Sequence, residues 1–139
     1  METVEIIEKL AEEGKAKNVK ESRLVLRHTV GKVIRQGDIY VHMVKADHPV
    51  GEQVNEKQLV NGTSLGARHI LQGDTIIYET ADRPSWLDSK MFLGKAFDTT
   101  GRAVITHPEH AHVEFGAGFV GRCVVSHQID MRTLKKVSD

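Results

Sequence analysis

The feature that most constrains the fold is a succession of short segments rich in β-branched residues and separated by turn-forming residues. The pairs Asn61-Gly62, Gly73-Asp74 and Thr100-Gly101 stand between such segments, as hairpin turns would. Many short strands with regular turn signals predict a mainly β fold, a small antiparallel barrel or sandwich. The predicted strands cover residues 24–30, 32–34, 39–44, 58–60, 68–71, 75–79, 94–98, 102–106, 110–115 and 119–129.

The start of the chain has a different periodicity, because its apolar residues fall at three- and four-residue spacings with glutamates on the opposite side. This pattern predicts an amphipathic helix that ends at Gly14, followed by a basic connector over residues 15–20. We expect one domain over residues 1–139, with the helix and connector in residues 1–20 and the β barrel or sandwich in residues 21–139. The apolar residues of the helix are Val4, Ile7, Leu10 and Ala11.

The charge balance and the cysteine count exclude several classes of protein. Lysine plus arginine and aspartate plus glutamate each number 19, so no excess charge favours nucleic acid or an anionic membrane surface. Cys123 is the one cysteine, which excludes an intramolecular disulfide. The sequence shows neither a basic, apolar secretory start nor an apolar stretch of about 20 residues. We therefore expect a cytoplasmic protein.

A histidine-rich segment, His107-Pro108-Glu109-His110-Ala111-His112, is the main candidate for a functional site. If residues 110–115 form a strand, His110, His112 and Glu114 share one face and an apolar set shares the other. Imidazole and carboxylate groups on one face suit a divalent transition metal such as zinc, iron, manganese or nickel. A chain of 139 residues can fold without a structural metal, so a bound ion would point to function.

The alternative is a solvated strand face that happens to be rich in histidine. His69 could supply a more distant metal ligand, although a lone histidine is more often structural. Cys123 lies among valines and is expected to be a small buried hydrophobic residue. We expect His127 to lie on an apolar strand. Three other histidines are expected at the surface or at a strand edge: His28, His42 and His48.

The pair His110-x-His112 and the glycines after it resemble the cupins, which are small β-barrels that hold a metal with His-x-His, a glutamate and a further histidine. This resemblance implies a cupin-like form of the barrel. Glu114, however, follows His112 by two positions, whereas the cupin glutamate follows by several. The second cupin motif has no clear match, so cupin oxygenase or isomerase chemistry is not carried over.

A fuller resemblance is to a group of small bacterial β-domain proteins of about this length. It covers roughly residues 35 to 139, without the predicted N-terminal helix. The segments that carry it are Gln36-Gly37-Asp38, Gly66-Ala67-Arg68-His69, His107-Pro108-Glu109-His110, Gly118 and Val137-Ser138-Asp139. The resemblance implies an architecture and one cluster of His69, His107 and His110, with no particular activity. The chain departs at Ala67, where that group usually has another histidine, and this puts a full ligand set in doubt.

Two functions follow. The first is a metal-binding β-domain, enzymatic or not, with ligands drawn from His69, His107, His110, His112 and Glu114. The second is a non-catalytic binding or assembly module whose histidines are structural or surface residues. Because small β-domains often protect exposed strand edges by pairing, we also expect a homo-oligomer, most simply a dimer.

Overall fold

The structure, a computed structural model, describes residues 23–60, 69–130 and 135–136. The helix and connector predicted over residues 1–20 lie outside these residues, as does the predicted Asn61-Gly62 turn. In the described segments there is no helix long and apolar enough to cross a membrane.

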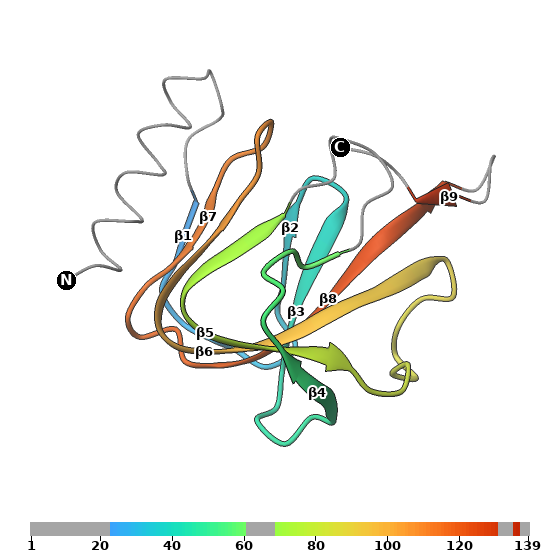
Figure 1. Ribbon diagram of the computed structural model, residues 1–139, viewed down its shortest axis with the longest axis horizontal. Helices are drawn as coiled ribbons and strands as arrows, with labels where there is room; N and C mark the ends of the chain where they lie inside the picture. Colours follow the sequence, from blue (N-terminus) through green and yellow to red (C-terminus); the bar gives the residue numbers. More distant parts are fainter. Residues whose placement is uncertain (1–22, 61–68, 131–134, 137–139) are drawn as a thin grey trace.

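The described residues form one curled sheet, so the mainly β prediction is confirmed (Figure 1). The strand order is β1-β7-β6-β8-β3-β2, and in addition β4 pairs with β5, β5 with β6, and β9 with β8. All pairs are antiparallel except β1 and β7, which run parallel. The strands are β1 Arg23–Val25, β2 Val33–Gln36, β3 Ile39–Val44, β4 Val50–Val54, β5 Ile70–Thr80, β6 Met91–Thr106, β7 Val113–Phe115, β8 Gly121–Asp130 and β9 Lys135–Lys136.

Two of the predicted hairpin turns are wrong, because β5 and β6 run through them. Gly73-Asp74 and Thr100-Gly101 instead face each other where the β5–β6 register shifts. Gly73 has a φ of 113°, and a Cβ there would lie 2.5 Å from the carbonyl oxygen of Arg102. The turn-forming residues therefore mark an irregularity in two long paired strands, of the kind that bends a sheet.

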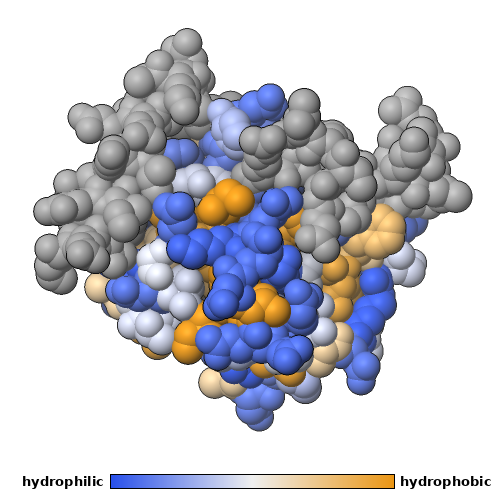
Figure 2. Space-filling view, viewed as in Figure 1, coloured by the Kyte–Doolittle hydropathy of each residue, from blue (hydrophilic) through white to orange (hydrophobic). Residues whose placement is uncertain are grey.

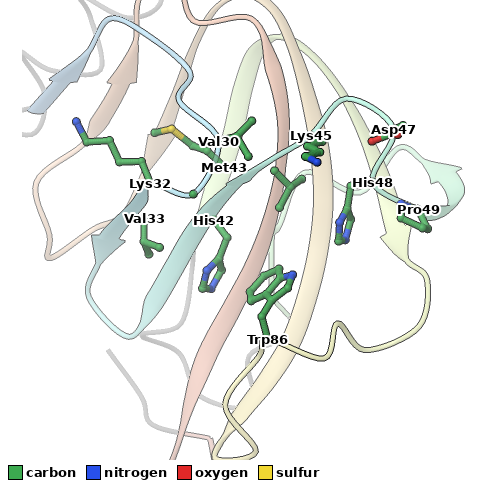
Figure 3. A pocket seen from close by; sticks show the side chains of 12 residues that line it. Val30, Lys32, Val33, His42, Met43, Lys45, Asp47, His48, Pro49 and Trp86 are labelled. Carbon is green, nitrogen blue, oxygen red and sulfur yellow. The ribbon is translucent and has the colours of Figure 1, made fainter.

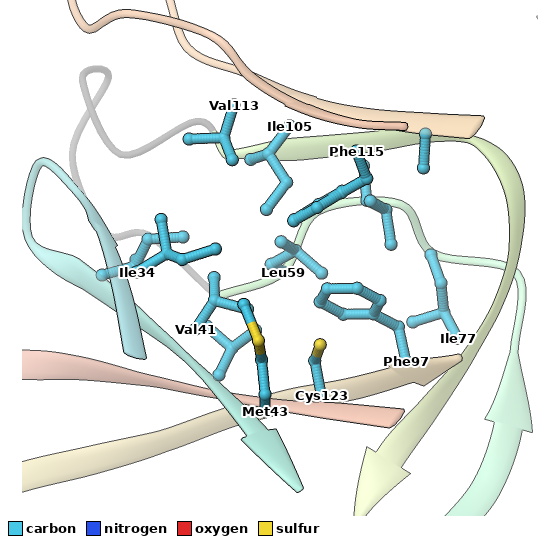
Figure 4. Packing of buried hydrophobic residues seen from close by; sticks show 14 of the residues in the cluster. Ile34, Val41, Met43, Leu59, Ile77, Phe97, Ile105, Val113, Phe115 and Cys123 are labelled. Carbon is cyan, nitrogen blue, oxygen red and sulfur yellow. The ribbon is translucent and has the colours of Figure 1, made fainter. Parts of the chain in front are cut away.

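The concave face of the sheet carries the main hydrophobic core. Along β3, Ile39, Val41 and Met43 point inward and are buried, alternating with half-buried Tyr40 and His42. They pack against residues from distant strands, including Phe97 and Phe115 (Figure 4). On one outer face, apolar residues show only as separate patches between hydrophilic ones (Figure 2).

The strand predicted over residues 110–115 is shorter than expected. It begins at Val113, and residues 107–112 form an irregular connection between β6 and β7. Val113 and Phe115 are buried in the core, which leaves Glu114 on the opposite face of β7. His110 therefore does not share a strand face with Glu114.

A buried histidine cluster as candidate functional site

The β5–β6 ladder brings together two histidines that lie far apart in the sequence. Ile70, the first residue of β5, pairs with Thr106, the last residue of β6, so His69 and His107 lie just beyond the paired ends of the two strands. Their ring centroids are 4.5 Å apart. The connection after β6 then places His110 with its ring centroid 4.6 Å from that of His107. We call these three side chains, with Gln36 and Asp38, the histidine cluster.

Gln36 and Asp38 reach the cluster from the tight turn between β2 and β3. Gly37 lies between them with a φ of 58°, a backbone conformation that favours glycine. The Nδ1 atom of His69 is 2.8 Å from Oε1 of Gln36, and its Nε2 atom is 3.0 Å from Oδ1 of Asp38. All three side chains are buried, and His69 has no exposed surface.

The amide of Gln36 has only one orientation that satisfies its neighbours. Its Nε2 atom donates to the carbonyl oxygens of Ile105 and Ala111, each at 2.9 Å. Its Oε1 atom must therefore face His69, and it can only accept a hydrogen bond there. One side chain thus joins the β2–β3 turn to the end of β6 and to the β6–β7 connection.

This arrangement fixes where protons lie on His69. Because Oε1 of Gln36 is an acceptor, Nδ1 of His69 must donate to it. The carboxylate of Asp38 is also an acceptor, so a second proton is needed between its Oδ1 atom and Nε2 of His69. A neutral imidazole and an ionised carboxylate do not satisfy both hydrogen bonds. The cluster therefore requires one additional positive charge.

The second ring has a different tautomer. The backbone N–H of Glu109 donates to Nδ1 of His107 over 3.0 Å, so the proton of neutral His107 lies on Nε2. The Nε2 atoms of His107 and His110 and the Nδ1 atom of His112 are all shielded from solvent. Within the described residues, no three His, Cys, Asp or Glu side chains are arranged as they stand to hold one metal ion.

The predicted site residues therefore separate into two groups. His69, His107 and His110 come together, which is the grouping that the second resemblance implies. The grouping of His110 with His112 and Glu114 assumed a strand over residues 110–115 and is wrong, because β7 begins at Val113 and both histidines precede it. His112 is buried just before β7, and its carbonyl oxygen accepts a hydrogen bond from the Arg23 backbone N–H.

Gln36 and Asp38 were not predicted as site residues. The signal for them was the Gln36-Gly37-Asp38 motif, which carries part of the resemblance to small β-domain proteins but was not interpreted as part of the site. Polar residues on both sides of a turn glycine can form a buried network, and this pattern would have indicated both of them.

The remaining titratable candidates lie elsewhere. Cys123 is fully buried as expected, and burial raises the pKa of its thiol. His127 is buried with its ring 5.3 Å from that of Phe92. The three histidines expected at the surface or an edge are half-buried: His28, His42 and His48.

Comparison with known proteins identifies one family. The model of one family, described as a domain of unknown function (DUF8820), matches residues 35–120. The chain belongs to this family. The DUF8820 match contains every residue of the histidine cluster, and it leaves out β1, β8 and β9. It agrees with the resemblance to small β-domain proteins without an assigned activity and lends no support to the looser cupin resemblance. Neither the curated proteins nor the solved structures contain a match to the chain.

Proposed function

We propose that the histidine cluster binds one divalent transition metal ion. The observation that carries the proposal is that His69 faces two hydrogen-bond acceptors in a fully buried site. Such a site needs one additional positive charge, either a second proton shared by His69 and Asp38 or a metal ion in its place. An uncompensated buried charge is costly, so one of the two must be present.

The distances in the cluster suit a shared ion. With bonds of about 2.0–2.2 Å, two neighbouring ligand atoms of one ion are about 3.4 Å apart at the tetrahedral angle and about 3 Å apart at a right angle, so a pair in hydrogen-bond contact has to separate by only a few tenths of an ångström. Nδ1 of His69 and Oε1 of Gln36 are 2.8 Å apart. Two imidazoles on one ion have centroids roughly 4.5 Å apart at a right angle and roughly 5.2 Å apart at the tetrahedral angle, and the two ring spacings here are 4.5 and 4.6 Å.

The bond between His69 and Asp38 supports the same proposal. Histidines that bind metals commonly donate their other ring N–H to a carboxylate, which fixes the tautomer and makes the ring a stronger ligand. With an ion at Nδ1, His69 would be neutral and would still donate from Nε2 to Asp38. The remaining positive charge would then be that of the ion.

Metal binding at His107 has a defined structural consequence. An ion at Nε2 would move the ring proton to Nδ1, which now accepts the hydrogen bond from Glu109. That hydrogen bond would be lost, so the β6–β7 connection would rearrange on binding. Nitrogen ligands with an amide oxygen suit zinc, iron, manganese and nickel, and a bound ion of this kind can polarise a carbonyl group or activate water.

Metal analysis of untagged protein, followed by calorimetric titration with zinc, tests the proposal. We expect about one equivalent of bound metal. His110→Ala should weaken zinc binding at least about tenfold, as loss of a ligand does. His48→Ala is the matched control, because it removes a half-buried histidine outside the cluster, and it should leave binding unchanged. Less than about one-tenth equivalent of any transition metal after reconstitution would overturn the proposal.

A second candidate, a non-catalytic module with structural histidines, is favoured by one specific observation. Both nitrogens of His69 and Nδ1 of His107 already take part in hydrogen bonds within the protein. In that case the required cation is a proton. The same titration separates the two candidates, because variants of a structural cluster would lower stability without any effect on bound metal. The predicted homodimer is a separate matter that light scattering would decide.

A further inference from the structure

A second site lies on the other face of the sheet, away from the histidine cluster. The inward and outward residues of β3 alternate, so His42 points outward while Val41 and Met43 contribute to the core. Over this outer face lies a pocket of about 720 Å³, lined by residues 30–33 at the start of β2, by β3, by the β3–β4 turn and by Trp86 of the β5–β6 connection (Figure 3). This volume is typical of sites that hold small molecules. We call it the tryptophan pocket, after Trp86.

Three rings line the tryptophan pocket. The indole of Trp86 lies 4.8 Å from the ring of His42 and 6.4 Å from that of His48, measured between centroids. Nε2 of His42 is 2.7 Å from Oγ of Ser126 on β8, which holds the imidazole in place. Trp86 is 49% exposed. An indole left half open beside two other rings offers a flat surface on which a planar ligand can stack.

The wall of the tryptophan pocket is fixed by a polar network on the same face. Arg122 donates to the carbonyl oxygen of His48 over 2.7 Å and forms two hydrogen bonds, of 2.8 and 3.0 Å, to Asp98. The hydroxyl of Tyr78 donates to the same carboxylate. These bonds anchor the β3–β4 turn, so the pocket is formed before a ligand arrives.

The connection that carries Trp86 is also anchored. The neighbouring Leu87 is buried, and its backbone N–H donates to the carbonyl oxygen of Pro84. Arg83 donates to the carbonyl oxygen of Met91 over 2.8 Å, which closes the connection onto the start of β6. The position of the indole is therefore set by its neighbours.

The charge of the tryptophan pocket indicates which ligands suit it. Lys32 and Lys45 line it together with one carboxylate, that of Asp47, and both lysines are exposed at its rim. Burial lowers the pKa of His42, so that ring is neutral near pH 7. Its face therefore adds apolar surface and no positive charge. The net charge of the rim is positive, which favours an anion.

We propose that the tryptophan pocket binds a small planar aromatic anion, such as an aromatic carboxylate, stacked on Trp86 with its charge toward Lys45 (Figure 3). The site is separate from the histidine cluster and does not depend on metal binding. Stacking supplies the affinity for a flat ring, and Lys45 supplies the preference for negative charge.

The test uses 2-naphthoate as the probe and NMR of the full-length protein as the readout. Trp86 is the sole tryptophan in the sequence, so its indole N–H gives one assigned signal in the pocket. We expect 2-naphthoate to shift this signal with a dissociation constant below about 1 mM. The neutral amide 2-naphthamide should bind at least about fivefold more weakly, and cyclohexanecarboxylate, which is not planar, should not bind measurably.

Variants complete the test, with binding followed on the ligand signals where the indole is absent. Trp86→Leu should lower the affinity for 2-naphthoate at least about tenfold and Lys45→Gln about threefold to fivefold. His110→Ala is the control and should bind the probe normally. An indole signal that 2-naphthoate does not shift, or equal affinity in Trp86→Leu, would overturn the proposal. Equal binding of 2-naphthamide would overturn the assignment of an anion.

Discussion

The β2–β3 hairpin contributes to both the histidine cluster and the tryptophan pocket, which lie on opposite faces of the sheet. The turn of the hairpin sends Gln36 and Asp38 inward to His69, whereas β3 sends His42 outward. The inward histidine is fully buried and bonded at both nitrogens. The outward one is half-buried, is neutral near pH 7 and lines an open pocket. The face to which a side chain points thus decides whether a histidine is enclosed in a buried hydrogen-bond network or lines an open pocket.

Removing His69 should have the largest effect on stability. His69→Ala leaves the Asp38 carboxylate buried without its partner, and losing one member of such a pair costs about 3–5 kcal/mol. Chemical denaturation of the metal-free protein would measure the change in the free energy of unfolding. The control His48→Ala should cost less than about 1 kcal/mol. Equal effects of the two substitutions would remove the distinction between the two regions.

Asp38→Asn separates charge from hydrogen bonding in the cluster. An asparagine amide can turn its N–H toward Nε2 of His69, which lets that histidine be neutral and removes the need for a cation. We expect a smaller loss of stability than for His69→Ala, about 1–2 kcal/mol. A loss as large as that of His69→Ala would contradict this proton assignment.

Arg122→Ala should have an intermediate effect, because Arg122 bonds Asp98 twice and also bonds the carbonyl oxygen of His48. Hydrogen bonds to charged groups contribute about 1.5–3 kcal/mol, but this pair is partly exposed, so we expect about 1–2 kcal/mol. Binding of 2-naphthoate should weaken as well, because the β3–β4 turn loses its anchor. Unchanged binding in a folded variant would show that the turn does not form the pocket wall.

His42 should make stability depend on pH. Burial lowers its pKa in the folded protein from the ordinary value of 6.5. Below pH 6.5 the unfolded chain therefore binds a proton at His42 more readily than the folded protein does. The contribution of His42 is complete above pH 6.5 and is lost as the pH falls toward its folded pKa. The stability of the wild type relative to His42→Gln, measured from about pH 7.5 to about pH 5, should decline on acidification, and a constant difference would contradict this.

Trp86→Leu should have the smallest effect on stability. The indole is half exposed, and substitutions at such positions usually change the free energy of unfolding by about 0.5 kcal/mol or less. The same variant should lose affinity for 2-naphthoate. A residue whose loss weakens binding but leaves stability unchanged belongs to a ligand site and not to the core. A large loss of stability in Trp86→Leu would therefore count against the pocket.

The sequence predicted the class of the fold and one strand, Ile39–Val44, with its bounds. The turns at Gly73-Asp74 and Thr100-Gly101 could not be predicted correctly, because glycine and aspartate favour a hairpin turn and a bulge for the same local reason. Only the pairing of β5 with β6 along their length shows that these residues face each other.

The histidine cluster was predicted in part for a similar reason. The motifs named His69, His107 and His110, but their meeting depends on the register of β5 and β6, which local patterns do not contain. Strand alternation misplaced His110, because the strand begins only at Val113. The tryptophan pocket had no sequence signal, since Trp86 and His42 come from connections and strands that only the curl of the sheet brings together.

The most direct test of the central claim, that the cluster requires a cation, is ¹⁵N NMR of the histidine side chains with and without zinc. In metal-free protein we expect both nitrogens of His69 to be protonated. After one equivalent of zinc, Nδ1 should lose its proton to the ion while Nε2 still donates to Asp38, and the Glu109 N–H signal should shift. A neutral, singly protonated His69 in metal-free protein that zinc leaves unchanged would contradict the account.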